Sequence, residues 1–132
     1  MIGIGAVFFL FIEEFQKKKY FIVLGEDDHS YLFATFYVNT TINYNFVENQ
    51  EVEKLHIVLK KAEYPFLKYD SFLNLSEHFP KTKISLEEEF KKDDKCLVYT
   101  LTDEQLHYLR KAFKENPIIK GKIKKKYRFF DN

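Results

Sequence analysis

Two segments decide the fold prediction for this chain: Lys68-Tyr69-Asp70-Ser71-Phe72-Leu73-Asn74-Leu75 and, earlier in the sequence, Val38-Asn39-Thr40-Thr41. Each is an apolar, strand-like run that carries small polar groups at one end. Aromatic and branched residues suit the half-buried surface of a β-sheet, so both runs predict strands. The hydroxyl and carboxylate groups at their ends are the first candidates for chemistry.

Further runs of the same kind lie on both sides of these segments. Val, Ile, Phe, Tyr and Leu dominate four more predicted strands, at Gly5–Ile12, Tyr20–Leu24, Tyr31–Val38 and Leu55–Leu59. The polar segment Gly25–Ser30 predicts a hairpin loop, and Pro65 indicates a turn before the strand Ser71–Leu75. Thr41–Lys54 is polar and rich in Asn and Glu, and we expect it to be a long surface loop.

Helical spacing is confined to the C-terminal part of the chain. Ser85-Leu86-Glu87-Glu88 predicts a capping box that opens a helix ending at about Lys92, and Thr102-Asp103-Glu104-Gln105 predicts a second one. The second helix should end at Asn116-Pro117. Strands first and helices last predict an α+β fold in a single domain, 1–132. We expect a small antiparallel β-barrel of five to six strands over about residues 1–101, then a C-terminal helix and a basic arm over 102–132.

Composition indicates a soluble domain and places its positive charge near one end. The 132 residues carry a net charge of only +1. Arg110–Arg128 holds nine basic residues against the single acid Glu115, a charge of +8, which leaves −7 for the rest. The lone Cys96 favours a reducing, cytoplasmic compartment. Ile2–Ile12 is too short to span a bilayer and lacks a basic flank, so we expect no membrane association.

Several kinds of active site have no support in the sequence. The four histidines, at 29, 56, 78 and 107, are scattered and do not have metal-ligand spacing, so we predict no metal. The early glycines precede a strand and do not form a nucleotide-binding loop. No nucleophile elbow of the Gly-x-Ser-x-Gly kind is present. We therefore expect no cofactor.

The basic arm has two interpretations. It interleaves aromatic rings with the cations of Lys120, Lys122, Lys124, Lys125, Lys126 and Arg128. Such a mixture can bind phosphates and stack on unpaired bases. Alternatively, Ile123, Tyr127 and Phe129 dock on the body of the domain, and the lysines only keep the segment soluble.

The polar strand ends could meet on one rim of the sheet. Thr40, Thr41, Asp70 and Ser71 would contribute hydroxyls and a carboxylate, and Lys17–Lys19 would contribute cations. A metal-independent ribonuclease needs these groups, because it moves a proton from a ribose hydroxyl and stabilises charge on phosphorus. The same residues also fit a purely structural role as caps of strands and turns.

The order of these segments resembles that of PemK/MazF-like toxins. The resemblance rests on Ile4–Leu10, Lys19–Leu24, Val38–Thr41 and Asp70–Leu75, and runs from about Ile4 to Leu75. It implies an SH3-like β-barrel, usually a homodimer, that cuts single-stranded RNA without a metal and is neutralised by a cognate antitoxin.

The resemblance also suggests roles for individual residues. Lys19 would stabilise charge, Thr40, Thr41, Asp70 and Ser71 would be the catalytic rim, and Lys18 would help bind RNA. The chain departs from the family at Lys18-Lys19-Tyr20, where active members carry an arginine, typically followed by proline. Lysine supplies charge without the two-pronged guanidinium. The alternative is a non-catalytic SH3-like barrel that binds a protein partner, since fifteen Phe and nine Tyr exceed what a small core buries.

Overall fold

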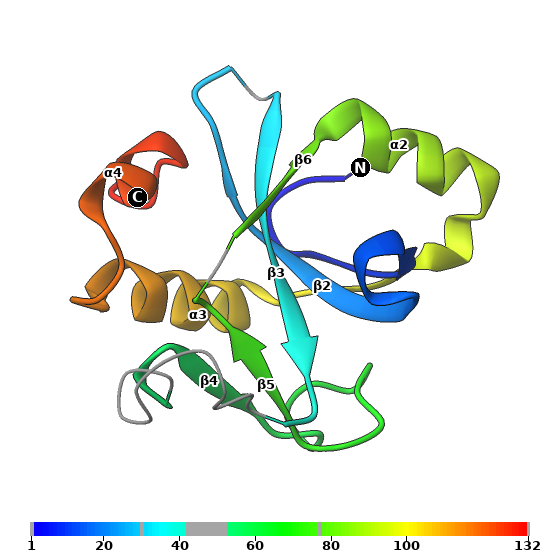
Figure 1. Ribbon diagram of the computed structural model, residues 1–132, viewed down its shortest axis with the longest axis horizontal. Helices are drawn as coiled ribbons and strands as arrows, with labels where there is room; N and C mark the ends of the chain where they lie inside the picture. The colour runs from blue at the N-terminus through cyan, green and yellow to red at the C-terminus, as the bar shows by residue number, and fades with distance from the viewer. Residues whose placement is uncertain (1, 30, 42–52, 77, 132) are drawn as a thin grey trace.

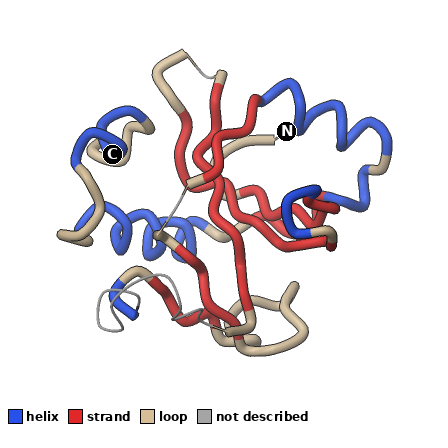
Figure 2. Tube along the Cα trace, viewed as in Figure 1, coloured by secondary structure: helices blue, strands red, loops and turns tan. Residues whose placement is uncertain are grey.

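The computed structural model describes residues 2–29, 31–41, 53–76 and 78–131. An antiparallel β-sheet runs through the middle of the molecule, and helices lie on either side of it (Figures 1 and 2). This confirms the predicted α+β class, and the predicted C-terminal location of the helices holds only roughly, because η1 (Glu13–Phe15) lies near the N-terminus. The predicted long loop Thr41–Lys54 falls mostly outside the described residues.

The sheet contains seven strands in the order β4-β5-β3-β2-β1-β7, with β6 beside β3. The strands are β1 (Ala6–Ile12), β2 (Lys17–Glu26), β3 (Leu32–Asn39), β4 (His56–Leu59), β5 (Ser71–Asn74), β6 (Phe79–Thr82) and β7 (Leu97–Thr100). The helical elements are η1 (Glu13–Phe15), α2 (Lys83–Lys92), η2 (Asp94–Cys96), α3 (Asp103–Glu115) and α4 (Gly121–Lys126). Among the described residues this path does not return on itself, so the sheet is open and the expected closure into a barrel was wrong.

Strand β3 joins two wings of the sheet. Along one edge it pairs with β2. Along the other edge it pairs with β6 near its start, where Thr35 lies opposite Phe79, and with β5 near its end, where Val38 lies opposite Leu73. Strand β4 then adds to β5. The small wing formed by β5, β4 and the end of β3 therefore extends beyond the main sheet.

Both faces of the sheet are buried, which explains its uninterrupted apolar runs. Successive residues of β2 point to opposite faces, as a strand requires. Phe21 and Val23 enter one apolar cluster with Leu86 of α2, whereas Ile22 and Leu24 enter another with helix α3. An apolar run without alternation is typical of a strand covered on both faces. The helices supply that cover and make closure into a barrel unnecessary.

The two predicted helix starts had different outcomes. Thr102 caps α3 with the full capping box to Gln105, as predicted, and α3 ends at Glu115 before Asn116. Helix α2 instead begins at Lys83, because the Thr82 side chain accepts the Ser85 backbone N–H. The capping-box prediction at Ser85 was therefore wrong.

The C-terminal segment docks on the sheet, as one interpretation of the basic arm proposed. Tyr127 and Phe129 are buried in the same cluster as Phe113 of α3, and the Phe113 and Phe129 ring centroids lie 4.3 Å apart. Gly25 of β2 makes this contact possible. A Cβ atom there would lie 2.8 Å from both the Phe129 ring and the Tyr127 Cβ.

No helix within the described ranges is long and apolar enough to cross a membrane.

Candidate functional site

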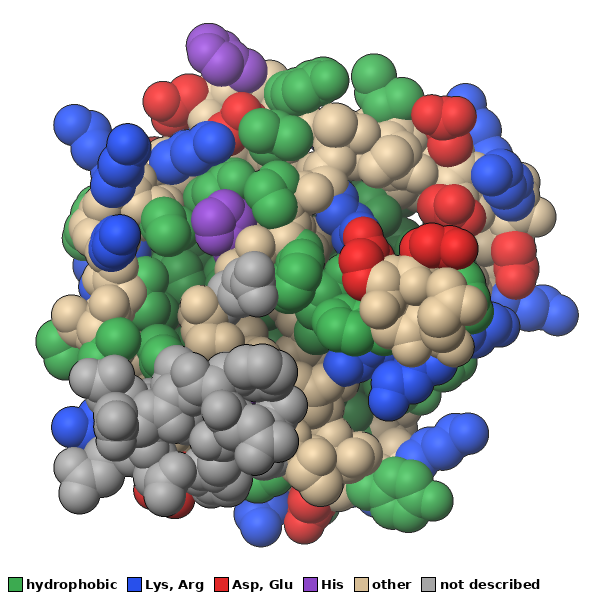
Figure 3. Space-filling view, in the orientation of Figure 1, with side chains coloured by type: hydrophobic (Ala, Val, Ile, Leu, Met, Phe, Trp, Pro, Cys, Tyr) green, Lys and Arg blue, Asp and Glu red, His purple; other side chains and the backbone are tan. Residues whose placement is uncertain are grey.

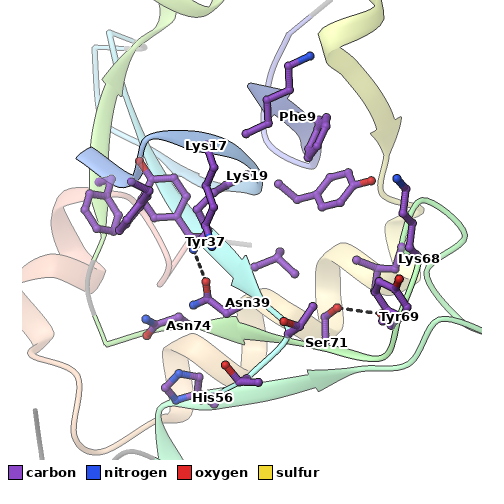
Figure 4. A pocket seen from close by; sticks show the side chains of 18 of the residues that line it. Phe9, Lys17, Lys19, Tyr37, Asn39, His56, Lys68, Tyr69, Ser71 and Asn74 are labelled. Atoms are coloured by element: carbon purple, nitrogen blue, oxygen red, sulfur yellow. Dashed lines mark hydrogen bonds between the residues drawn. The ribbon is translucent and has the colours of Figure 1, made fainter. Parts of the chain in front are cut away.

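A cleft of about 640 Å³ opens where the start of β2 faces the small wing (Figure 4). The walls come from β1 and β2, from the end of β3, from β4 and β5, and from the loop before β5. Residues far apart in the sequence are thus brought to one hollow, which makes this cleft the candidate functional site.

The cleft is strongly basic. Four lysines line it, Lys17, Lys18, Lys19 and Lys68, and its described lining residues include no Asp or Glu. Elsewhere the charges are mixed: Figure 3 shows acidic and basic side chains together over α2 and mainly basic ones over α4. A concave surface with one sign of charge concentrates the electrostatic field, so this cleft attracts anions.

Lys19 is the most constrained of the four cations. Its Nζ donates a hydrogen bond to Asn39 Oδ1 and lies 4.4 Å from the centroid of the Phe15 ring and 5.6 Å from that of Tyr37. Burial lowers the pKa of the Lys19 ammonium below its ordinary value, and the charge of Lys17 lowers it further. The contacts hold the ammonium in a defined position, as cation–π geometry favours.

Aromatic rings form much of the remaining wall. Phe9 and Tyr20 pack with ring centroids 4.4 Å apart, and Tyr20 also meets Phe66 at 5.4 Å. Tyr69, across the cleft, is 68% exposed. Exposed or half-exposed rings beside cations offer flat surfaces on which planar ligands stack.

The small wing presents a polar face to the same cleft. Antiparallel partners place their side chains on one face, and His56 pairs with Asn74 while Asn39 pairs with Phe72. Because alternate residues share a face, Asn39, Asn74 and His56 lie on the same side of the wing. All three line the cleft. Sequence reasoning missed the two asparagines and assigned His56 a structural role, since only the register reveals their common face.

The predicted catalytic residues are not all brought together. Lys19, Thr40, Thr41 and Ser71 line the cleft, with both threonines exposed. Ser71 is buried, however, and its hydroxyl donates a hydrogen bond to the Tyr69 carbonyl at 2.8 Å. The hydroxyl proton is therefore already engaged in a structural hydrogen bond.

Asp70 does not line the cleft. Its carboxylate accepts the Lys61 backbone N–H at 2.8 Å and lies 3.6 Å from the Lys60 ammonium. The Lys61 hydrogen bond, followed by the charge of Lys60, lowers the pKa of the Asp70 carboxyl. Of the five residues predicted to be catalytic, four therefore line the cleft, and Asp70 is an exposed ion-pair partner outside it.

The basic arm lies apart from the cleft, because none of its predicted nucleic-acid-binding residues lines it. Lys124 is buried and its ammonium donates to the Asn116 carbonyl at 2.7 Å. The Arg128 carbonyl accepts from Arg110, which also stacks on Phe129. Lys120, Lys122, Lys125 and Lys126 remain exposed. Lys18 is the one residue of the predicted RNA-binding set that lines the cleft.

No cluster of three His, Cys, Asp or Glu side chains suited to a metal occurs in the part of the chain that the structure describes. No protein-family model matches the sequence, and no curated protein matches it significantly. The geometry of the cleft therefore carries the functional argument.

Proposed function

We propose that this protein binds single-stranded RNA in the cleft between β2 and the small wing. The observation that carries the proposal is the combination of four lysines, no acidic lining residue in the described chain, and a wall of aromatic rings. Lysines neutralise backbone phosphates and release counterions. Aromatic side chains stack on unpaired bases, which a duplex keeps within its own helix.

A toxin-like role is part of this proposal. Its support is the resemblance of the order of the strand segments, from about Ile4 to Leu75, to that of PemK/MazF-like toxins. In such a role the protein would act in the cytoplasm as a homodimer, and a cognate antitoxin would cover the cleft. An acidic antitoxin segment would suit a basic, aromatic-lined hollow.

Metal-independent cleavage of the bound RNA is a second candidate, favoured by the position of His56. Imidazole is the side-chain group that most often serves as a general acid or base, and His56 lines the cleft that also holds Lys19. In this reaction the ribose 2′-oxygen attacks the adjacent phosphorus and the 5′-oxygen of the next nucleotide leaves. A base accepts the 2′-hydroxyl proton and an acid returns one to the leaving oxygen.

The binding proposal is tested by fluorescence anisotropy with a labelled single-stranded RNA, a DNA of the same sequence and the annealed RNA duplex. We expect the single strands to bind and the duplex to bind weakly. The logarithm of affinity should fall with the logarithm of salt concentration, with a slope no steeper than about −3, because each neutralised phosphate of a single strand contributes about −0.7.

Matched lysine variants locate the binding surface. Lys18→Ala or Lys68→Ala should weaken binding and reduce the salt slope by about 0.7, whereas Lys111→Ala, an exposed lysine of α3 outside the cleft, should not. Equal effects from all three variants would contradict the assignment to the cleft. Failure of every oligonucleotide to bind would refute RNA binding and favour the protein-interaction alternative, for which Phe11, Tyr69 and Tyr108 offer exposed rings.

Cleavage is tested separately with the same single-stranded RNA in the presence of EDTA. Products that persist with EDTA and disappear in His56→Ala would support the second candidate. Binding without cleavage would leave the protein as an RNA-binding module.

A further inference from the structure

The two asparagines of the small wing have carboxamide oxygens that are already engaged. Asn39 Oδ1 accepts from the Lys19 ammonium. Asn74 Oδ1 accepts from the Ser76 backbone N–H at 2.9 Å and from the Ser76 hydroxyl at 2.5 Å. An ammonium and a backbone N–H can only donate, so these contacts fix which end of each carboxamide is oxygen.

This orientation decides what the wing can offer to a ligand. A carbonyl oxygen has two lone pairs, and Ser76 fills both of those on Asn74. The Lys19 ammonium occupies one lone pair of the Asn39 oxygen. Asn74 therefore has only its NH₂ group left to offer to a ligand, and both asparagines belong to the cleft lining that also contains Lys19. The fixed group that Asn74 offers is thus a hydrogen-bond donor.

We propose that the small wing is a base-recognition subsite that selects bases with a carbonyl oxygen at pyrimidine position 4 or purine position 6, uracil and guanine, over cytosine and adenine, which carry an amino group there. The inference rests on the proposed binding of single-stranded RNA and names the chemistry that the cleft would distinguish. The O4 atom of uracil and the O6 atom of guanine accept hydrogen bonds from such a donor. The amino groups that cytosine and adenine carry at the same positions would instead face it donor to donor.

The engaged oxygens are what make this selection possible. An asparagine with a free oxygen and a free NH₂ pairs with the N6 and N7 atoms of adenine. Asn74 cannot do so, because its oxygen is held by Ser76. The exposed hydroxyls of Thr40 and Thr41 rotate and can donate or accept, so they do not discriminate.

Two comparisons of homopolymers, each exchanging a carbonyl oxygen for an amino group at the same ring position, test the preference directly. Labelled oligouridine is compared with oligocytidine, and oligoinosine with oligoadenosine, by anisotropy at one salt concentration, in single-stranded form. We expect the keto member of each pair to bind about fivefold more tightly or better, the lower end of what one base-edge contact contributes. Equal binding within both pairs would refute the subsite, while absence of all binding would refute the proposed function as well.

A charge-matched pair of variants assigns the effect to Asn74. Asn74→Asp keeps an oxygen for Ser76 and replaces the NH₂ donor with an acceptor, so the uridine-to-cytidine affinity ratio should fall toward one or invert. Lys17→Ala changes the charge of the cleft by the same amount without adding an acceptor, and it should weaken both oligomers while leaving the ratio as in the unmodified protein. A uridine-to-cytidine affinity ratio that changes equally in both variants, or that changes in neither of them, would overturn the role of Asn74.

Discussion

Replacing Gly25 by alanine should weaken the packing of the C-terminal segment on the sheet. Gly25 lies in β2, where the segment Tyr127–Phe129 crosses it. The new methyl group would sit 2.8 Å from the Phe129 ring and 2.8 Å from the Tyr127 Cβ. The Tyr127 atom is attached directly to the backbone, so rotation of a side chain cannot relieve the contact.

The size of the effect follows from the two ways in which the fold can respond. Accommodating an extra methyl in a packed interior costs about 1–3 kcal/mol. Full release of the segment would expose Tyr127 and Phe129, which are now buried, at a cost of roughly 1.5–3 kcal/mol for each ring. Adjustment in place is therefore cheaper. Alanine also restricts the unfolded chain more than glycine does, which offsets about 0.4–1 kcal/mol of this cost. We therefore expect the free energy of unfolding to fall by about 1–2 kcal/mol.

Thermal unfolding and limited trypsin digestion report the two consequences. A loss of this size should lower Tm by roughly 3–8 °C for a domain of this length, and cleavage after Lys125 and Lys126 should become faster. Gly3→Ala is the matched control, because nothing lies within 4 Å of the added atom. If Gly25→Ala melts and is digested like Gly3→Ala, the described docking of the C-terminal segment is incorrect.

Three further predictions concern stability. Phe113→Ala removes a buried ring that packs on Phe36 and Phe129 and should cost about 3–5 kcal/mol in urea unfolding; a cost below about 1 kcal/mol would contradict the packing described for α3. Lys124→Met removes the hydrogen bond to the Asn116 carbonyl and should lower Tm, whereas Lys122→Met, at an exposed position of the same helix, should not; equal Tm values would argue against a buried Lys124. The pKa of the Asp70 carboxyl is lowered in the fold. The carboxylate therefore stabilises the protein at pH values above its ordinary pKa of 3.8, and it loses that effect as the pH falls through the lowered pKa. Asp70→Asn should therefore reduce Tm slightly at neutral pH but not in acid, and an equal reduction at both would refute the assignment.

Local signals predicted the parts of the fold that depend on local contacts. The helix that Thr102 caps was found because its capping box and its terminating Asn116-Pro117 lie within the segment itself. Strand β6 was missed because Pro80 disfavours a strand interior, although Pro80 pairs with Ala34 at an edge of β3.

The barrel was predicted because strand-like segments come first and helical ones last, and the error has a physical origin. Continuous apolar runs in β1, β2 and β3 require cover on both faces of the sheet, and α2 and α3 provide it. An alternating pattern, with one solvated face, would instead have favoured a small closed barrel.

Part of the lining of the cleft was predicted, and the rest was not. The strand ends indicated that Lys19, Thr40 and Ser71 would share a rim, and they do line one cleft. Asp70 is held outside by its hydrogen bond to Lys61, a local turn contact that the sequence did not signal. Lys68, Asn74 and His56 enter the cleft only through loop geometry and strand register, which depend on long-range pairing.

Mapping a bound RNA on the protein by NMR tests the central claim most directly. Amide chemical shifts are followed during titration with a single-stranded oligouridine. We predict saturable changes at Lys17–Tyr20, in Val38–Thr41 and in Tyr69–Asn74, with little change in Gly121–Lys126. Changes confined to the exposed lysines of α4, or no change at a concentration that saturates anisotropy, would contradict binding in the cleft.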